Sequence, residues 1–285
     1  MNDLKIGVII DSFRKNFNDG VLAAREVGAE GIQVYAVGNE MDPEKLTGEM
    51  IREKLKIVKD NGLEVSAICG DLGGHGFEIS SDNPLKIERS VRIMELALKM
   101  ETKVVTTHIG VIPSDTSCER YSVMQDACRM LGEAAASAGG YFAIETGPET
   151  AVVLRQFLDS LGTKGVAVNL DPANLVMVTG DDPVKAVETL GPYIVHTHAK
   201  DGRQLKKSDP RKIYGFFADG GIEDIRIWEY FEETPLGKGD VDFTAYVDAL
   251  RKIGYRGYLT IERETGEEPA ADIRTAVDFL KRTIK

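Results

Sequence analysis

The stretch YIVHTHA at residues 193–199 is a short run of apolar and β-branched residues, which is typical of a buried β-strand. Seven similar runs occur along the chain, and helical periodicity follows each of the eight. The other predicted strands are KIGVII 5–10, GIQVYAV 31–37, EVSAIC 64–69, KVVTTH 103–108, YFAIE 141–145, GVAVNLD 165–171 and GYLTIER 257–263. Helices are predicted at about 18–28, 43–61, 83–100, 118–138, 150–161, 183–190, 241–253 and 269–284.

Eight strand-then-helix units in one chain predict an α/β fold, a single (β/α)8 TIM barrel that spans residues 1–285 as one domain. The alternative is a doubly wound open sheet, which would carry a glycine-rich phosphate loop after its first strand. Here that position reads IIDSFRKNF, without the GxGxxG pattern. One long irregular region, about 202–240, interrupts the alternation, and such loops are commonly functional lids.

Two helix starts show a capping pattern, a side-chain oxygen followed by proline in the first turn. They are Asn83 before Pro84 and Asp182 before Pro183.

Composition narrows the classes of partner. The 285-residue chain is 42% hydrophobic and has a formal net charge of -11. This charge argues against nucleic-acid binding, because a protein that binds the phosphate backbone needs a basic surface. No apolar run is long enough for a membrane span, and the N-terminus lacks a signal-peptide pattern. The three cysteines form no CxxC motif. We therefore expect a cytoplasmic protein with reduced thiols, bound to neither nucleic acid nor membrane.

Polar side chains end the later strands, at the face where TIM barrels place their chemistry. They are His108, Glu145, Asp171, His196 with His198, and Glu262 with Glu264. One strand-end carboxylate commonly caps a loop, but four consecutive strands that end in metal-capable residues indicate a shared site.

Side-chain alternation supports this interpretation, because residues two apart on a strand face the same side. Glu145, Asp171, His198 and Glu262 then point into the barrel, while the intervening residues are apolar. Buried groups of this kind need a cation or a proton-sharing network. Three carboxylates and one imidazole favour Mn²⁺ or Mg²⁺, with Co²⁺, Fe²⁺ and Zn²⁺ as alternatives.

Five motifs give the chain a resemblance to the xylose isomerase-like TIM-barrel superfamily, in its sugar isomerase/epimerase branch. That branch includes D-tagatose 3-epimerase, L-xylulose-5-phosphate 3-epimerase and inosose dehydratase. The motifs are IETG at 144–147, NLDPAN at 169–174, HTHAKD at 196–201, PLGKGDVDF at 235–243 and GYRGYLTIERE at 254–264. The resemblance implies a metal held by Glu145, Asp171, His198 and Glu262, with His196 one layer deeper.

The chain departs from the 3-epimerase pattern at two positions. Asn174 stands where those epimerases have a histidine, and an amide can hydrogen-bond a hydroxyl but cannot carry a proton. The arginine that they carry after the seventh strand is matched only by Arg203, one position away. Both differences bear on the substrate more than on the metal.

The resulting hypothesis is a divalent-metal-dependent sugar isomerase or epimerase that enolises a ketose or keto-sugar. Glu145 and Glu262 exchange the proton on opposite sides of the reacting carbon, and the metal stabilises the enediolate charge. A dehydratase or lyase acting on a keto-inositol or 3-keto sugar uses the same enolate and is the alternative. A non-catalytic sugar-binding barrel is a further alternative. The partner is a small sugar or polyol ketone, and a homo-oligomer is compatible with the sequence.

The substrate contacts are predicted to be His108, Asn174, Lys200 and Arg203. Two of these side chains could instead bind within the protein: loop backbone could satisfy His108, and Lys200 could pair with Asp201 or Glu264. The glycine-rich segment CGDLGGHGF at 69–77 is either a lid or a surface loop. The aromatic residues of the 202–240 region either cover the substrate or form an oligomer contact; they are Phe216, Phe217 and Trp228.

Overall fold

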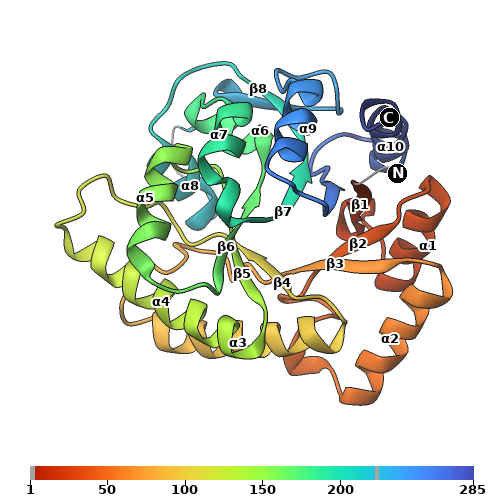
Figure 1. The fold of residues 1–285 in the computed structure, drawn as a ribbon, viewed down its shortest axis with the longest axis horizontal. Helices are drawn as coiled ribbons and strands as arrows, with labels where there is room; N and C mark the ends of the chain where they lie inside the picture. Colours follow the sequence, from red (N-terminus) through yellow and green to blue (C-terminus); the bar gives the residue numbers. More distant parts are fainter. Residues whose placement is uncertain (1–3, 222–224) are drawn as a thin grey trace.

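Eight parallel strands close into a barrel in a computed structural model that describes residues 4–221 and 225–285 (Figure 1). The order around the barrel is β1-β10-β7-β6-β5-β4-β3-β2. The strands are β1 Lys5–Ile9, β2 Gly31–Tyr35, β3 Glu64–Cys69, β4 Val104–Thr107, β5 Tyr141–Glu145, β6 Val166–Leu170, β7 Ile194–Ala199 and β10 Tyr258–Ile261. The predicted (β/α)8 fold class is confirmed.

The predicted helices surround the barrel, with ends within a few residues of the expected ones (Figure 1). They are α1 Phe17–Val27, α2 Gly48–Asp60, α3 Asn83–Lys99, α4 Glu119–Ala138, α5 Ala151–Leu161, α7 Pro183–Leu190, α9 Phe243–Lys252 and α10 Pro269–Thr283. Shorter turns of helix are η1 Ile10–Phe13, η2 Pro43–Lys45, α6 Pro172–Asn174, η3 Leu175–Thr179, η4 Gly191–Tyr193 and η5 Ile227–Glu229. The segment predicted as one helix at 43–61 is therefore divided into η2 and α2.

One of the two capping predictions is right and the other is wrong. Asp182 accepts hydrogen bonds from the backbone N–H groups of Val184 and Lys185 and so caps α7. Asn83 instead belongs to α3, and its Nδ2 donates to the carbonyl of Phe77. The residue before the helix is Asp82, whose side chain makes no capping bond. The asparagine amide is used to fasten the preceding loop rather than the helix end.

The strand faces divide as the sequence alternation predicts. Ile144, Val168 and Leu259 point outward and are almost fully buried in the core. Asn169 and Thr260 point inward and form hydrogen bonds inside the barrel. The polar interior layer therefore lies directly beneath the strand ends and supports whatever binds there.

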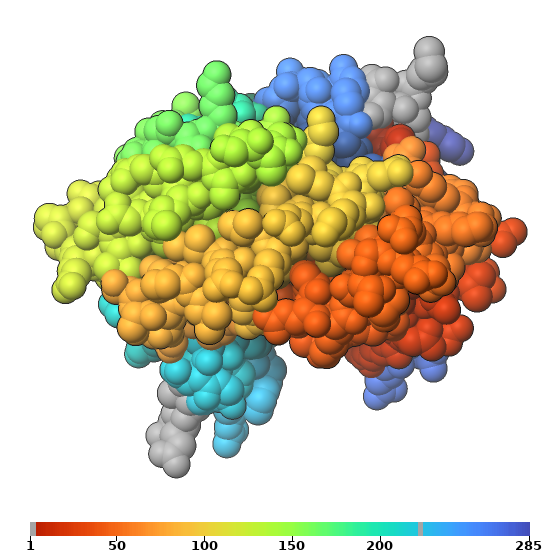
Figure 2. All heavy atoms as spheres, turned by 90° about the horizontal axis from the view of Figure 1, so that it is seen from below, coloured from red at the N-terminus to blue at the C-terminus, as the bar shows by residue number. Residues whose placement is uncertain are grey.

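The region 202–240 was predicted from the sequence to be irregular, and this prediction is wrong. It holds the helix α8 Pro210–Ala218 and two antiparallel strands, β8 Asp201–Gln204 and β9 Phe231–Thr234; residues 222–224 lie outside the described part. The two strands read DGRQ and FEET, and polar sequences of four residues lack the apolar alternation that indicates a strand. This segment, coloured cyan, projects from one face of the molecule (Figure 2).

The carboxylate of Asp201 binds the backbone at the end of the region 202–240. Its Oδ2 accepts from the backbone N–H groups of Gly237 and Gly239, and its Oδ1 accepts from those of Val241 and Gly202. An asparagine would turn one acceptor into a donor that faces N–H groups. We expect Asp201→Asn to lower the free energy of unfolding by about 1–3 kcal/mol. Thermal melts should show this loss, and the neighbouring exposed Asp240→Asn should melt like the wild type; equal melting of all three would contradict the role of Asp201.

Candidate metal centre

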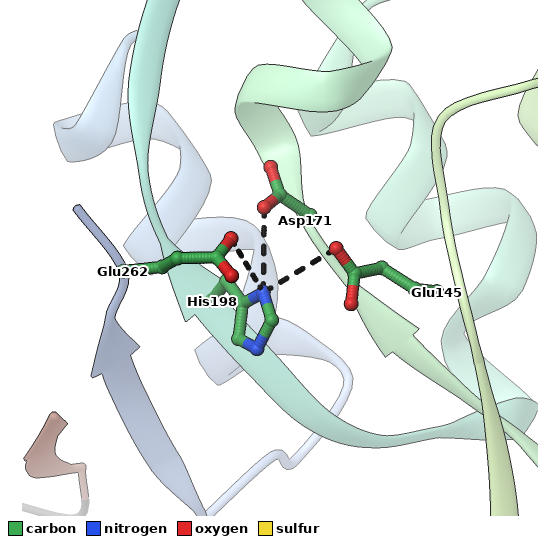
Figure 3. A group of neighbouring side chains, drawn as sticks. All are labelled: Glu145, Asp171, His198 and Glu262. Carbon is green, nitrogen blue, oxygen red and sulfur yellow. Dashed lines mark hydrogen bonds and ion pairs between the residues drawn. The ribbon is translucent and has the colours of Figure 1, made fainter. Parts of the chain in front are cut away.

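Four side chains from adjacent strands meet at the C-terminal mouth of the barrel. Glu145 ends β5, Asp171 follows β6, His198 belongs to β7 and Glu262 follows β10. Nδ1 of His198 lies 3.6 Å from Glu145 Oε1, 3.3 Å from Asp171 Oδ2 and 3.4 Å from Glu262 Oε2 (Figure 3). One donor atom from each residue lies within 4.8 Å of the others, and all four side chains are buried. The structure thus brings together the four residues that the sequence singled out as ligands.

The orientation of His198 leaves its Nδ1 facing the carboxylates. Its Nε2 lies 3.1 Å from Oε1 of Gln33, whose own Nε2 donates to Thr106 Oγ1. Because the Gln33 oxygen can only accept, a His198 proton on Nε2 satisfies this contact, while the amide nitrogen Nδ2 of Asn169 also lies 3.2 Å from Nε2. With the proton on Nε2, a bound cation would displace any proton from Nδ1 and use its lone pair, which is the arrangement that metal-binding histidines require.

The charges of the cluster fit a divalent cation. Burial lowers the pKa of His198, but Glu145 and Glu262 hold it well above its usual range. Burial raises the pKa of Asp171, which is fully inaccessible to solvent. Three carboxylates in one buried site need positive charge to remain ionised. Burial raises the pKa of both glutamates, yet His108 and His198 lower that of Glu145, and Lys200 and His198 lower that of Glu262, whereas the pKa of Asp171 stays raised. A divalent ion among the carboxylates would supply further positive charge. The oxygen-rich donor set matches ions such as Mn²⁺ or Mg²⁺.

A hydrogen-bonded chain supports the cluster from below. Thr260 Oγ1 lies 3.0 Å from Nε2 of His196, and Nδ1 of His196 lies 2.9 Å from Oδ1 of Asn169. Asn169 Nδ2 then donates to Oε2 of Glu145 at 3.1 Å. Burial and the nearby His198 hold the pKa of His196 well below its usual range, so this imidazole is neutral. His196 lies one layer below the cluster, as the family resemblance implied, and orients Glu145 through Asn169.

His108 lies on the Glu145 side of the cluster. Its Nδ1 is 3.1 Å from Asp71 Oδ2, and its Nε2 is 3.7 Å from Glu145 Oε1. The ring also stands 5.8 Å from that of Tyr214. Burial lowers the pKa of His108, but the charges of Glu145 and Asp71 raise it to about 10. The partner of His108 Nδ1 is therefore the Asp71 side chain and not the loop backbone that the sequence offered as an alternative.

Lys200 lies on the opposite side of the cluster. Its ammonium donates to Glu262 Oε2 at 3.0 Å and to Glu264. Burial lowers the pKa of Lys200, but the carboxylates of Glu262 and Glu264 raise it well above its usual range. Of the two ion pairs that the sequence offered as alternatives for Lys200, the one with Glu264 is present, and Glu262 is a further partner.

The remaining two predicted substrate contacts differ in position. Asn174 donates from Nδ2 to Glu145 Oε1 at 3.0 Å, so it belongs to the cluster. Arg203 instead donates to the backbone carbonyl of Lys238, within the turn that Asp201 anchors. Arg203 is therefore not brought to the four ligands.

Four residues near the site were missed by sequence analysis: Gln33, Tyr35, Asp71 and Tyr214. Gln33 reaches His198, and the Tyr35 hydroxyl lies 3.4 Å from Glu262 Oε1. Asp71 belongs to the glycine-rich segment 69–77, and the glycine content of that segment was the signal in the sequence that could have drawn attention to Asp71. The same segment contacts the residue that follows α8, because His75 Nε2 lies 2.9 Å from Asp219 Oδ1. The aromatic residue of α8 that faces the site is Tyr214, whereas Phe217 and Trp228 are mostly exposed.

Gly147 permits the close approach of Tyr214. Its φ is 150°, and a Cβ there would lie 2.3 Å from the Tyr214 hydroxyl oxygen and 2.9 Å from Asn174 Cβ. We expect Gly147→Ala to lower the melting temperature, because overpacking of this kind costs about 1–3 kcal/mol. Adding Tyr214→Phe should restore part of the loss. Gly162→Ala measures the cost of an alanine at a positive φ of 68° without a contact, since nothing lies within 4 Å of its Cβ position; a Tyr214→Phe change that restores none of the loss in Gly147→Ala would refute the contact.

The fold and the site together define a TIM barrel with an acidic, single-histidine cluster at its C-terminal mouth. A model described as xylose isomerase-like TIM barrel matches residues 21–283, so the chain belongs to that family. No helix in the described part of the chain is long and apolar enough to cross a membrane.

Three known proteins illustrate the similarity. The chain is 28% identical over 259 residues to 3-dehydroshikimate dehydratase from Bacillus anthracis, which covers 87% of this chain and 87% of that protein. It is 30% identical over 152 residues to the uncharacterized protein YfiH from Bacillus subtilis (strain 168), covering 48% of this chain and only 42% of that protein. The solved D-psicose 3-epimerase from Clostridium cellulolyticum H10 superposes with a TM-score of 0.74 and 14% identity, over 99% of this chain and 100% of that chain. Because the sequence identity to the D-psicose 3-epimerase is only 14%, this last comparison supports the fold and not the function.

Proposed function

We propose that this protein is a divalent-metal-dependent isomerase or epimerase that enolises a small sugar or polyol ketone. The observation that carries the proposal is the position of two buried glutamates, Glu145 and Glu262, on different sides of His198 within one cluster (Figure 3). Glu145, Asp171, His198 and Glu262 would hold the metal, for which we favour Mn²⁺. When bound, a divalent cation polarises a carbonyl oxygen and neutralises developing negative charge.

The two glutamates are held in different surroundings, which suits a two-base reaction. Asn169 and Asn174 donate to the Glu145 carboxylate, whereas the Lys200 ammonium donates to Glu262. One carboxylate removes the proton next to the substrate carbonyl, and the other returns a proton to the opposite face, which inverts that carbon. Return of the proton to the neighbouring carbon gives aldose–ketose isomerisation instead.

Two cationic side chains flank the reacting position. His108 lies on the Glu145 side and Lys200 on the Glu262 side. Donors in these places can hydrogen-bond the oxygens of an enediolate, whose negative charge is greatest when the proton has left carbon. Both side chains are already held by acidic partners, so little reorganisation is needed.

A dehydratase is the second candidate. It is favoured by the similarity to 3-dehydroshikimate dehydratase over 87% of both chains and by Asn174 in the place of the epimerase histidine. The same enolate then expels a β-hydroxyl instead of being reprotonated. A cytoplasmic location, which suits the three free cysteines, and a homo-oligomer remain predictions from the sequence.

The test is proton exchange at carbon. Protein loaded with Mn²⁺ is incubated in D₂O with a panel of ketoses, keto-inositols and 3-keto sugars, and NMR follows deuterium next to the carbonyl. We expect exchange with at least one member and none with metal-free protein. A new epimer or aldose identifies the isomerase, and loss of a hydroxyl identifies the dehydratase. A loaded protein that exchanges no member of the panel would refute the proposal for those substrate classes.

A further inference from the structure

Two polar atoms at the mouth of the barrel have no hydrogen-bond partner among residues 4–221 and 225–285. They are the hydroxyl of Tyr214 on α8 and Nε2 of His108, whose nearest acidic neighbour, Glu145 Oε1, is 3.7 Å away and beyond hydrogen-bond distance. Both residues are only half-buried, and neither atom is among the fully enclosed polar atoms that lack a partner. Both atoms are therefore open to a ligand that enters the mouth.

The Tyr214 hydroxyl lies beside the Glu145 end of the cluster. A Cβ on Gly147 would meet both this hydroxyl and the Cβ of Asn174, whose amide donates to Glu145. Burial raises the pKa of Tyr214 well above its usual range, and Glu145 contributes most among the charges that add to this effect. The phenol therefore keeps its proton, so it is a hydrogen-bond donor next to a carboxylate proposed to transfer protons.

The other open atom belongs to an imidazole held in a fixed orientation. Oδ2 of Asp71 lies 3.1 Å from Nδ1 of His108, and Oδ1 of Asp71 accepts from the backbone N–H of Gly73. Burial raises the pKa of Asp71, but its contacts with His108 and Gly73 lower it below its usual value, so this carboxylate is ionised. Because a carboxylate can only accept, Nδ1 keeps a proton in both charge states of the ring, and Nε2 is the nitrogen left for a ligand.

A hydroxyl group is the ligand that suits these two atoms. Its oxygen accepts a hydrogen bond from the Tyr214 phenol, and it then donates to Nε2 of a neutral His108 ring or accepts from Nε2–H of a charged one. A carbonyl oxygen cannot donate, and an ammonium group cannot accept. Since Nε2 is 3.7 Å from Glu145, this hydroxyl would belong to a molecule that reaches the cluster directly.

We propose that Tyr214 is a specificity-determining residue whose hydroxyl, together with Nε2 of His108, binds a hydroxyl group of the substrate on the Glu145 side. The substrate is then a ketone that carries at least one hydroxyl group besides its carbonyl oxygen. This inference rests on the proposed enolising function. It assigns part of substrate recognition to α8, which lies outside the eight strands of the barrel.

Binding can be followed at His108 without turnover. Protein labelled with ¹⁵N-histidine and loaded with Mg²⁺, which is not paramagnetic, is titrated with xylitol, sorbitol and myo-inositol. The chain has four histidines, and the His108 signals are assigned by their loss in His108→Gln. We expect at least one polyol to shift the Nε2 resonance of His108 while Nδ1 stays protonated. If none of the three polyols shifts it, the inference is overturned.

Tyr214→Phe tests the donor, because it removes only the hydroxyl. Binding of the active polyol should weaken about five- to tenfold, which corresponds to the loss of one hydrogen bond. Tyr141→Phe is the matched control and should bind like the wild type, since Tyr141 is exposed at the start of β5, at the opposite end of that strand from Glu145. Unchanged affinity in Tyr214→Phe, or an equal loss in Tyr141→Phe, overturns the inference.

Deoxy derivatives of the polyol, each lacking one hydroxyl, separate a direct contact from a disturbed site. One derivative should bind the wild type and Tyr214→Phe equally, because it lacks the group that the phenol contacts. A disturbed site would weaken every derivative by the same factor, and that result overturns the inference. Tyr214→Phe should also melt no lower than the wild type, since the hydroxyl has no hydrogen bond within the described residues to lose; a lower melting temperature would assign the hydroxyl to the protein instead.

These results are independent of the proton-exchange screen, because a polyol has no carbonyl to enolise. A protein that binds polyols in this way but exchanges none of the ketones would refute the proposed function alone. Exchange of a ketone with the same kcat/KM in the wild type and in Tyr214→Phe would refute this inference alone.

Discussion

Glu145→Gln is expected to abolish measurable proton exchange while the barrel remains folded. The amide keeps the shape of the side chain, and its oxygen can still accept from one of the two amides, Asn169 or Asn174, that donate to Glu145. Its NH2 faces the other, which costs stability, and it cannot accept a proton from carbon. Loss of a positioned general base costs about 10²–10⁴-fold in rate. Glu262→Gln should have a comparable effect, because the proposed reaction needs a carboxylate on each side of the reacting carbon.

The design must separate loss of the base from loss of the metal, since both glutamates are candidate ligands. Exchange is therefore measured at saturating Mn²⁺, with bound metal determined by elemental analysis and folding by circular dichroism. Glu267→Gln, an exposed change outside the cluster, is the control and should exchange at the wild-type rate. A Glu145→Gln variant that holds metal and exchanges normally would remove Glu145 from catalysis and leave the sugar-binding barrel as the better interpretation.

Addition of Mn²⁺ to metal-free protein is expected to raise its melting temperature by several degrees. Three buried carboxylates around His198 repel one another, and a divalent ion relieves that repulsion only in the folded state. Metal at about one hundred times its dissociation constant stabilises by about 2.7 kcal/mol. Each kcal/mol corresponds to roughly 2–4 °C for chains of comparable size.

Asp171→Asn should remove most of this shift without unfolding the local structure. The Oδ1 atom of Asp171 accepts from the backbone N–H of Asn174, and an asparagine oxygen can do the same. The second oxygen, which faces His198, is the one replaced. Asp182→Asn is the matched control, because Asp182 caps α7 outside the cluster and should leave the metal-dependent shift intact. Equal shifts in all three proteins would place the metal elsewhere.

The four candidate ligands were predictable because each lies at or next to the end of a buried strand with clear alternation. Local sequence carries that information, since side chains two residues apart share a face. Gln33 was not predictable in the same way. It lies on β2, and only closure of the barrel brings its amide within 3.1 Å of His198 on β7. In the sequence alone, before the barrel is known to close, a glutamine inside a strand looks like any other polar residue.

Arg203 and Tyr214 show the other kind of limit. Both belong to the region 202–240, where the short polar strands β8 and β9 were not recognised. Without β8, the direction of the Arg203 side chain could not be inferred, and the structure directs it to the carbonyl of Lys238. Without α8, Tyr214 could not be separated from the neighbouring aromatic residues.

The contact between Gly147 and Tyr214 also constrains how this family branch can diverge. A side chain at position 147 and a tyrosine hydroxyl at position 214 compete for the same space. Related sequences that keep the tyrosine should therefore retain glycine at 147, and those that replace the glycine should carry a smaller residue at 214. The two positions are 67 residues apart in the chain, yet they should co-vary as a pair, because a smaller residue at 214 removes the part of the cost that comes from the tyrosine hydroxyl.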